Sequence, residues 1–252
     1  MDRLVFNSSA AIREQATVRQ SLVNELANVA TTGFKRSYEV ALRSVKAEGD
    51  GFDTRYQSQA VADQMIQLNP GPVMATGRPL DIAITGKAVL GVQAENGELA
   101  FSRRGDLRLG VNGTLEDGQG RLVLGQGGPV TVPPGFLVSV NPDGTIFAND
   151  PAQPAAPGVF IDQLLLRDAS QVDLRRRADG LFMVDGQPPG SDFASGPEAP
   201  RLIPQALEGS NVNAVTTMVK LMDHSRTFEA QIRVIKEAKS LDESGSSMMR
   251  NA

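Results

Sequence analysis

The chain offers few side chains of the kinds that carry out chemistry. Its single histidine, His224, stands beside Asp223 and Arg226 in a predicted helix, and the sequence contains no cysteine. A lone histidine works as a general base only where a substrate and an orienting partner converge on it. One histidine and no cysteine also exclude thiol nucleophiles, disulfides, iron–sulfur clusters and two-histidine metal sites within one chain. We interpret His224 as an ordinary solvated or interface side chain.

Carboxylates and glycine-rich segments are the other features that could mark an active site. Asp50 and Asp53 lie in a predicted loop, and Glu116-Asp117 lies at a predicted turn. A glycosidase needs two carboxylates facing each other across a cleft, and nothing in these spacings indicates such a pair. The segments 118–120 and 125–128 complete neither a dinucleotide-binding nor a phosphate-loop pattern. We therefore predict no catalytic residue, no cofactor and no metal.

The charge balance also argues against a nucleic-acid partner. The chain has 25 Lys and Arg against 29 Asp and Glu, and its aromatic residues are 2 Tyr and 10 Phe. Binding to nucleic acid relies on phosphate neutralisation and on aromatic stacking, and this composition favours neither. We interpret the short basic clusters Arg103-Arg104 and Arg175–Arg177 as surface residues. So few aromatic side chains also provide few anchors for a small-molecule substrate.

Two helices are predicted, one near each end of the chain. Residues 1–32 contain no Pro or Gly, and Gly33 then provides a natural helix stop. Residues 210–242 form the second helix, which Ser210 or Asn211 could cap. Along it runs a mostly apolar seam at alternating steps of four and three residues: Ala214, Met218, Leu221, Ser225, Phe228, Ile232, Ile235 and Lys239.

The segment between the helices reads as β structure. Short apolar runs recur at 80–84, 88–92, 107–109, 122–124, 136–140, 159–166 and 181–184. Six Asn-Gly or Asp-Gly pairs lie among these runs, at positions 96–97, 112–113, 117–118, 143–144, 179–180 and 185–186. Both residues of such a pair tolerate the positive φ of a tight turn, so the pairs predict hairpins.

These elements predict an α+β fold in which the N- and C-terminal helices pair in a coiled-coil-like layer, with a central, mainly antiparallel β domain. We expect five parts: the N-terminal helix at 1–34, a linker or extended segment at 35–76, the β domain at 77–206, the C-terminal helix at 207–244 and a flexible tail at 245–252. A pair of amphipathic helices still leaves apolar surface, which must be covered by the β domain or by other subunits.

Three segments resemble the bacterial flagellar rod and hook family. The first is Asn24-Glu25-Leu26-Ala27-Asn28-Val29-Ala30-Thr31-Thr32-Gly33-Phe34, which matches the family's N-x-L-A-N-x-x-T-x-G-F signature. The second is 207–215, LEGSNVNAV, which is similar to the segment that opens the family's last helix. The third is 78–84, RPLDIAI, which resembles the entry to the family's β domain. Relatives often differ at 86–90 and 102–105, both within the β domain.

The resemblance implies a mechanical rather than a catalytic role. Family members polymerise through their terminal helices into a helical tube, the rod of the basal body, which transmits torque from motor to hook and passes exported subunits through its lumen. A heterologous interface that does not close generates such a tube. The expected partners are other copies, neighbouring proximal and distal rod proteins, the flagellar type III export apparatus and surrounding ring proteins. The expected location is the rod where it spans the periplasm, and the N-terminus shows no cleaved signal peptide.

The same resemblance selects candidate interface residues from the two helices and the exit of the first. They are Leu22, Leu26, Asn28, Gly33, Phe34, Met218, Leu221, Phe228, Ile232 and Ile235. The short link between Phe34 and Arg78 favours a proximal rod member over a distal rod or hook-type member. Two readings from other classes remain: a secreted β-rich glycan hydrolase, and a binding module with a helical dimerisation stalk.

Overall fold

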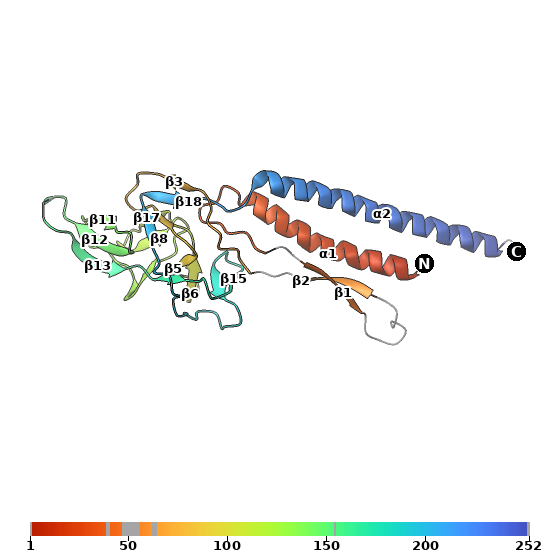
Figure 1. The fold of residues 1–252 in the computed structure, drawn as a ribbon, viewed down its shortest axis with the longest axis horizontal. Helices are drawn as coiled ribbons and strands as arrows, with labels where there is room; N and C mark the ends of the chain where they lie inside the picture. The colour runs from red at the N-terminus through yellow and green to blue at the C-terminus, as the bar shows by residue number, and fades with distance from the viewer. Residues whose placement is uncertain (1, 39–40, 47–55, 62–64, 154, 251–252) are drawn as a thin grey trace. The chain divides into compact units, whose positions relative to one another are not determined.

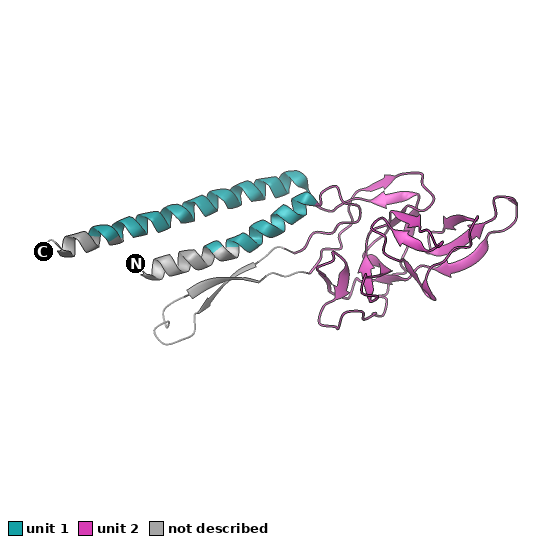
Figure 2. Ribbon diagram, turned by 180° about the vertical axis from the view of Figure 1, so that it is seen from behind, with its two compact units in different colours: residues 1–27, 39–63, 213–252 teal, residues 28–38, 64–212 magenta. Residues whose placement is uncertain are grey.

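A computed structural model describes residues 2–38, 41–46, 56–61, 65–153 and 155–250. Within the two helices it describes the side chains of residues 12, 15–27, 214–241 and 243–244. The chain divides into two compact units (Figure 2). Unit 1 comprises 1–27, 39–63 and 213–252, and unit 2 comprises 28–38 and 64–212.

Unit 1 contains the two long helices and one hairpin. Helix α1 (Asp2–Ala27) and helix α2 (Ala214–Arg250) run side by side in opposite directions (Figure 1). Strand β1 (Ala41–Lys46) pairs antiparallel with β2 (Tyr56–Val61), and β2 lies next to α1. This hairpin falls in the segment that we predicted only as a linker or extended chain.

The helix ends differ from the predicted ones. Helix α1 stops at Ala27 rather than near 32, because the chain then makes turns in which the Thr31 N–H donates to the Asn28 carbonyl at 3.1 Å. The predicted caps of α2, Ser210 and Asn211, were wrong. The Oδ1 of Asn213 accepts the Thr216 N–H at 3.0 Å, which makes Asn213 the N-cap. At its other end α2 includes 245–250, beyond the predicted helix end.

Unit 2 consists of short antiparallel strands. The largest sheet has the order β14-β5-β6-β16-β15, a second has the order β11-β12-β13, and the remaining strands pair as β3-β18, β4-β17, β7-β8 and β9-β10. The strands from β3 to β10 are Val73–Ala75, Ile82–Ile84, Ala88–Gln93, Leu99–Ser102, Leu107–Leu109, Leu115–Asp117, Leu124–Gly125 and Gly128–Pro129. Those from β11 to β18 are Leu137–Val140, Thr145–Asn149, Val159–Gln163, Leu166–Asp168, Leu174–Arg176, Phe182–Val184, Leu202–Pro204 and Ala206–Glu208. Over the described residues the chain is mainly β, with antiparallel sheets and two helices, which agrees with the predicted α+β class.

Strand β5 explains why the core of unit 2 has two parts. Its residues 88–92 are all buried, and successive side chains point to opposite faces of the sheet. Leu90 and Val92 therefore join a larger core with residues such as Ile82 and Ile146, while Val89 joins a smaller one with Phe101. The ring of Phe101 meets that of Phe193 edge-on at 4.9 Å. A strand buried on both faces accounts for its unbroken apolar run.

Five of the six predicted turn pairs lie where the chain reverses between neighbouring strands, and the sixth, Asp185-Gly186, forms a turn after β16 that joins no hairpin. At five of the six pairs the glycine has a positive φ, namely residues 97, 113, 144, 180 and 186. The exception is Asp117-Gly118, where the positive φ falls on Gly120 instead. There the Asp117 Oδ1 accepts the backbone N–H groups of Gln119 and Arg121, so the aspartate closes the turn from its own side chain.

Candidate functional site

The two terminal signature segments meet inside unit 2. The Gly33 N–H donates to the Glu208 carbonyl at 2.8 Å, and the Asn211 N–H donates to the Phe34 carbonyl at 3.2 Å. The Oδ1 of Asn211 accepts the Arg36 N–H at 2.7 Å. Backbone segments that lie about 175 residues apart in sequence are thereby joined directly. The first segment leaves α1 and the second leads into α2, so one place in unit 2 holds the exit of α1 and the entry to α2.

A buried group of three charges lies at this junction. The Glu208 carboxylate accepts Lys35 Nζ on Oε1 at 2.7 Å and Arg103 Nη2 on Oε2 at 2.7 Å. The side chains of Lys35, Arg103 and Glu208 are at most 1% exposed. The Gly71 N–H donates to Oε1 at 2.9 Å, so both oxygens of the carboxylate accept at least one hydrogen bond. We call Lys35, Arg103 and Glu208 the buried triad.

The cations of the triad also bond to backbone. Lys35 Nζ donates to the Asn69 carbonyl at 2.9 Å. The Arg103 guanidinium donates to the carbonyls of Ile84, Gly86 and Ala88 at 2.6 to 2.9 Å. Burial, and secondarily Arg103, lowers the pKa of Lys35 to about 8, against the opposing attraction of Glu208. Burial likewise lowers the pKa of Arg103, and Glu208 counteracts that effect. Removing the shared carboxylate would leave two buried cations without a counter-charge.

Phe34 and Gly33 are held at the same junction. The Arg176 guanidinium lies over the Phe34 ring, 4.4 Å from its centroid, and donates to the Lys35 carbonyl. Gly33 is buried with a φ of +67°, and a Cβ at this position would collide with the Arg103 carbonyl. Glycine is therefore required here for both its backbone conformation and its lack of a side chain.

The remaining predicted interface residues lie on the helices of unit 1 or at the end of α1. On α1, Leu22 and Leu26 are half-buried, as is Asn28 just beyond it, where Asn28 Oδ1 accepts the Thr31 hydroxyl at 3.1 Å. On α2, Leu221, Ile232 and Ile235 are half-buried, whereas Met218 is 47% exposed and Phe228 37% exposed.

The least exposed row of α2 differs from the predicted seam by about one position around the helix. It steps by four and three residues through Thr217, Leu221, His224, Phe228, Gln231, Ile235 and Ala238, which we call the inner row. Thr217 and Ala238 are buried, and His224 and Phe228 line a cavity together with α1 residues. The predicted seam shares Leu221, Phe228 and Ile235 with the inner row. Its Ser225 and Lys239 are exposed.

The opposite side of α2 is uncovered in this chain. A second series, at steps of four and three residues, is exposed throughout: Val215, Val219, Met222, Arg226, Ala230 and Arg233. We call it the outer stripe. Its first three members are apolar and 71%, 52% and 62% exposed. Three exposed apolar side chains at regular helical spacing make this face of α2 a candidate contact surface.

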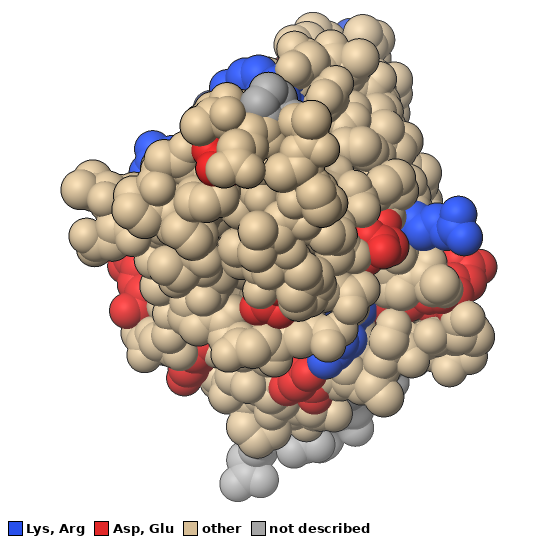
Figure 3. Space-filling model, turned by 90° about the vertical axis from the view of Figure 1, so that its left-hand side faces the viewer, with Lys and Arg blue, Asp and Glu red and all other residues tan. Residues whose placement is uncertain are grey.

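Unit 2 carries a separate uncovered apolar patch. On β11 and β13, Leu137, Val159 and Phe160 are 59–63% exposed, and the Phe160 ring lies 6.2 Å from that of Phe147. The face that includes these strands is mostly uncharged, with acidic and basic side chains scattered across it (Figure 3). This face is a second candidate contact surface.

Comparison with known proteins distinguishes between the functions that the sequence left open. Residues 83–148 match the family model described as the flagellar hook protein FlgE/F/G D1 domain, and 203–248 match the flagellar basal body rod FlgEFG protein C-terminal model. Over 238 residues, 93% of each chain, the protein is 33% identical to the flagellar basal-body rod protein FlgF of Salmonella typhimurium. The chain belongs to the flagellar rod protein family. Its identity is 32% to FlgF of Escherichia coli and 27% to FlgG of Agrobacterium fabrum.

Membership of the flagellar rod family agrees with the expected non-catalytic role. These relatives are named as rod proteins, and the glycan-hydrolase reading has no support. Neither α1 nor α2, over their described residues, is long and apolar enough to cross a bilayer. In the described ranges, no group of three His, Asp or Glu side chains is placed to hold a metal ion. Asp50 and Asp53 lie outside the described residues.

The sequence prediction missed the buried triad of this rod protein. Arg103 was predicted to be a surface residue, and this was wrong, because the buried carboxylate of Glu208 and three carbonyls surround its guanidinium. The available signal was that Lys35 directly follows the first signature segment and that Glu208 lies within the second. A cation and an anion thus stand directly beside residues that we had singled out.

Proposed function

We propose that the chain is a structural subunit of the bacterial flagellar basal-body rod and that it assembles through its terminal helices. The observation that carries this proposal is the 33% identity to FlgF over 93% of both chains. The outer stripe of α2 supports it, because a regular apolar series on a long helix is suited to helix–helix packing between subunits.

The arrangement of the subunits in the rod is proposed from the same family resemblance. α1 and α2 pair in a coiled-coil-like layer, and copies stack into a tube that transmits torque and leaves a central channel. The inner row supports the pairing, since its steps of four and three residues are those of a heptad seam. Neighbouring proximal and distal rod proteins, the type III export apparatus and ring proteins are the proposed partners. The proposed location is the rod within the periplasm.

The ten predicted interface residues remain part of this proposal, and we assign them different roles. Gly33, Phe34 and Asn28 position the exit of α1, because their contacts are internal to unit 2. Met218, with the outer stripe beside it, faces outward and contacts a neighbouring subunit. Leu221, Ile232, Ile235, Leu22 and Leu26 support the helix pair, and Phe228 lies at the edge of that pair.

Complementation tests the proposal. The gene is deleted from its host and replaced by the wild-type chain, by Met222→Asp in the outer stripe, or by Thr227→Asp as the matched control. Thr227 is an exposed α2 residue outside the stripe. We expect Met222→Asp to abolish swimming and rod assembly, seen by electron microscopy of basal bodies, while Thr227→Asp swims. Normal rods with Met222→Asp would refute the role of this helix face.

A further inference from the structure

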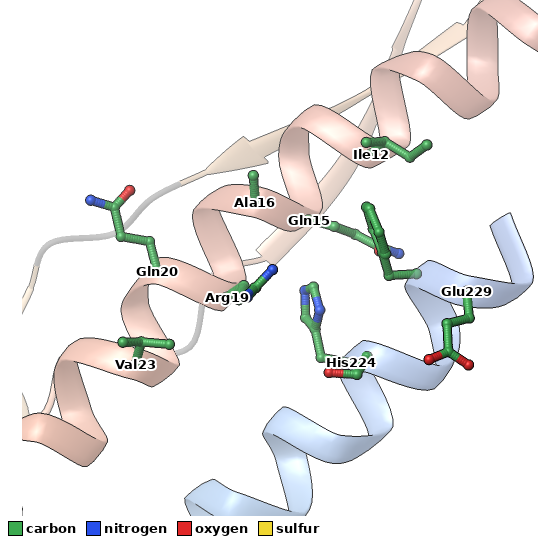
Figure 4. A pocket seen from close by; sticks show the side chains of 10 residues that line it. Ile12, Gln15, Ala16, Arg19, Gln20, Val23, His224 and Glu229 are labelled. Atoms are coloured by element: carbon green, nitrogen blue, oxygen red, sulfur yellow. The ribbon is translucent and has the colours of Figure 1, made fainter. Parts of the chain in front are cut away.

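The pair of terminal helices is incompletely packed in this chain. A cavity of about 690 Å³ opens between α1 and α2, and Gln15 and Arg19 from α1 and His224 from α2 point into it (Figure 4). Oε1 of Gln15 and Nε2 of His224 are buried and have no hydrogen-bond partner among the described residues. Empty space and unpaired buried polar atoms both weaken packing. The helix pair alone is therefore a weak connection between the two ends of the chain.

The chain passes between the two units at four places, and all four lead to three segments of unit 2. The crossings follow residues 27, 38, 63 and 212. On the side of unit 2 they continue into residues 28–38, 65–71 and 208–212, and the first of these segments has a crossing at each end. We call them the first, second and third entry segments. Force that reaches unit 2 along the chain, whether from α1, from the β1–β2 hairpin or from α2, enters through these segments.

Backbone hydrogen bonds join the first entry segment to the second. The Tyr38 N–H donates to the Met65 carbonyl at 2.9 Å, and the Gln67 N–H donates to the Arg36 carbonyl at 2.8 Å. An antiparallel bridge lies between these two bonds. The two segments on either side of the hairpin crossing are therefore held together inside unit 2.

Asn211 joins the third entry segment to both of the others. Its N–H donates to the Phe34 carbonyl at 3.2 Å, and its Oδ1 accepts the Arg36 N–H at 2.7 Å. Its Nδ2 donates to the carbonyls of Gln67 at 2.9 Å and Asn69 at 3.1 Å. One side chain thus links all three entry segments, and no crossing can separate from the others while its bonds hold.

The buried triad connects the same three segments by charge. Lys35 of the first segment donates to the Glu208 carboxylate of the third at 2.7 Å and to the Asn69 carbonyl of the second at 2.9 Å. The Gly71 N–H of the second segment donates to the same carboxylate at 2.9 Å. Because the side chains of Lys35 and Glu208 are at most 1% exposed, opening this group leaves buried charges unpaired, which is costly.

Arg103 connects the entry segments to the sheets of unit 2. Its guanidinium bonds to the Glu208 carboxylate and also donates to the carbonyl of Ile84 on β4 and of Ala88 on β5, both at 2.6 Å. The second and third segments also approach closely, since a Cβ on Gly71 would collide with the backbone carbonyl of residue 209. Force at the entry segments is therefore passed on to the strands of the core.

We propose that the three entry segments form a mechanical clamp, which must open before force applied through the helices can unfold unit 2. Its bonds are those of Lys35, Arg103, Glu208 and Asn211 and of the backbone that they hold. The inference rests on the proposed rod function for the origin of the force, which is the torque that a rod subunit transmits. The clamp itself is a property of one chain and acts without assembly.

Single-molecule force spectroscopy of the full chain tests the clamp, and the absence of cysteine leaves the attachment points free to be chosen. Ala30→Cys and Val215→Cys provide exposed attachment points on either side of the clamp. Asn211→Ala removes the three hydrogen bonds of that side chain. At the same force, we expect this variant to unfold at least about tenfold faster than the unsubstituted clamp, because these bonds break at the barrier to unfolding.

The matched control is a core substitution of equal thermodynamic cost. Ile146, fully buried in the larger core, is changed to Val or to Ala, whichever lowers the urea midpoint as much as Asn211→Ala does. Core contacts that are still present when the clamp opens stabilise the native state and the barrier alike, so their loss barely changes the unfolding rate. We expect the core variant to unfold at close to the rate of the unsubstituted clamp.

A second pair of attachment points tests whether the effect depends on where force is applied. Val111→Cys and Ala156→Cys lie in exposed loops of unit 2, and the chain between them includes no residue of the clamp. Force applied there should unfold Asn211→Ala no faster than the unsubstituted clamp. Glu208→Gln, measured with both pairs of attachment points, repeats the test on the buried triad, and we expect the same dependence.

The outcomes separate the clamp from the rod function. Equal acceleration by Asn211→Ala and by the core variant under force from the helix side would overturn the clamp, as would acceleration by Asn211→Ala with both pairs of attachment points. If Met222→Asp abolishes rods but the clamp variants show no specific acceleration, the rod function stands and the clamp is wrong. If the specific acceleration is found while Met222→Asp leaves rods intact, the clamp stands and the proposed origin of the force is wrong.

Discussion

Replacing Glu208 by Gln is the most direct test of the buried triad. The substitution preserves the side-chain shape but removes the negative charge that Lys35 and Arg103 share. The NH2 group of the glutamine would also place N–H donors against the N–H donors that now bond to the carboxylate. Glu208 accepts Lys35 Nζ, the Gly71 N–H and two nitrogens of Arg103, all at 2.7 to 2.9 Å. Breaking a buried ion pair by removing one partner costs about 3–5 kcal/mol. At a urea slope of about 2 kcal/mol per molar, we expect the midpoint to fall by roughly 2 M.

The assay is urea unfolding of the full chain followed by far-ultraviolet circular dichroism in the β region. The control is Asp192→Asn, which breaks a pair with Arg167 whose side chains are 25% and 42% exposed. Such surface pairs contribute about 0–1 kcal/mol, so the control midpoint should move by less than about 0.5 M. Adding Lys35→Met to Glu208→Gln removes one orphan cation and should recover part of the loss. A Glu208→Gln midpoint as close to wild type as the control's would refute the reasoning.

Three further predictions concern single residues. Since burial lowers the pKa of Lys35 from 10.5 to about 8, the unfolded chain binds more protons than the folded chain between these values. Stability should therefore rise with pH across that window by about 3 kcal/mol from this group, and Lys35→Met should remove the rise in urea midpoints. Gly33→Ala should destabilise unit 2 by more than Gly135→Ala, because both have positive φ but only Gly33 would meet a carbonyl; the matched urea midpoints check this. Asn213→Ala should destabilise α2 by about 1 kcal/mol through loss of its N-cap, measured by helix melting at 222 nm.

Local patterns in the sequence were sufficient for most elements. The apolar runs and turn pairs predicted the strand reversals of unit 2, because a positive φ at glycine is a local requirement that the pair itself satisfies. The same holds for the two helices, whose uninterrupted periodicity is visible in the sequence. The ends of the helices could not be predicted as well. Several polar residues near the start of α2 could cap it, and only the backbone path selects Asn213.

Non-local pairings account for the features that the sequence did not reveal. Arg103 looks like a surface residue until strand pairing brings Glu208 beside it, 105 positions away. The sequence pattern also did not determine which side of α2 faces α1. Two rows of residues that lie one position apart on the helix share Leu221, Phe228 and Ile235 and differ in the residues between them. A chain with polar residues in its inner row breaks the rule that apolar side chains face the partner helix. Rules of this kind are most often broken at functional surfaces.

The contact between Lys35 and Glu208 has a consequence for the order in which the molecule folds. It closes a loop of 173 residues, and the entropy cost of bringing such distant segments together is roughly 4–5 kcal/mol. One buried ion pair cannot offset that cost while the intervening chain is still disordered. We therefore expect the strands of unit 2 to form first and the link between the exit of α1 and the entry to α2 to close last. Only molecules with a completed β unit would then hold the exit of α1 and the entry to α2 together.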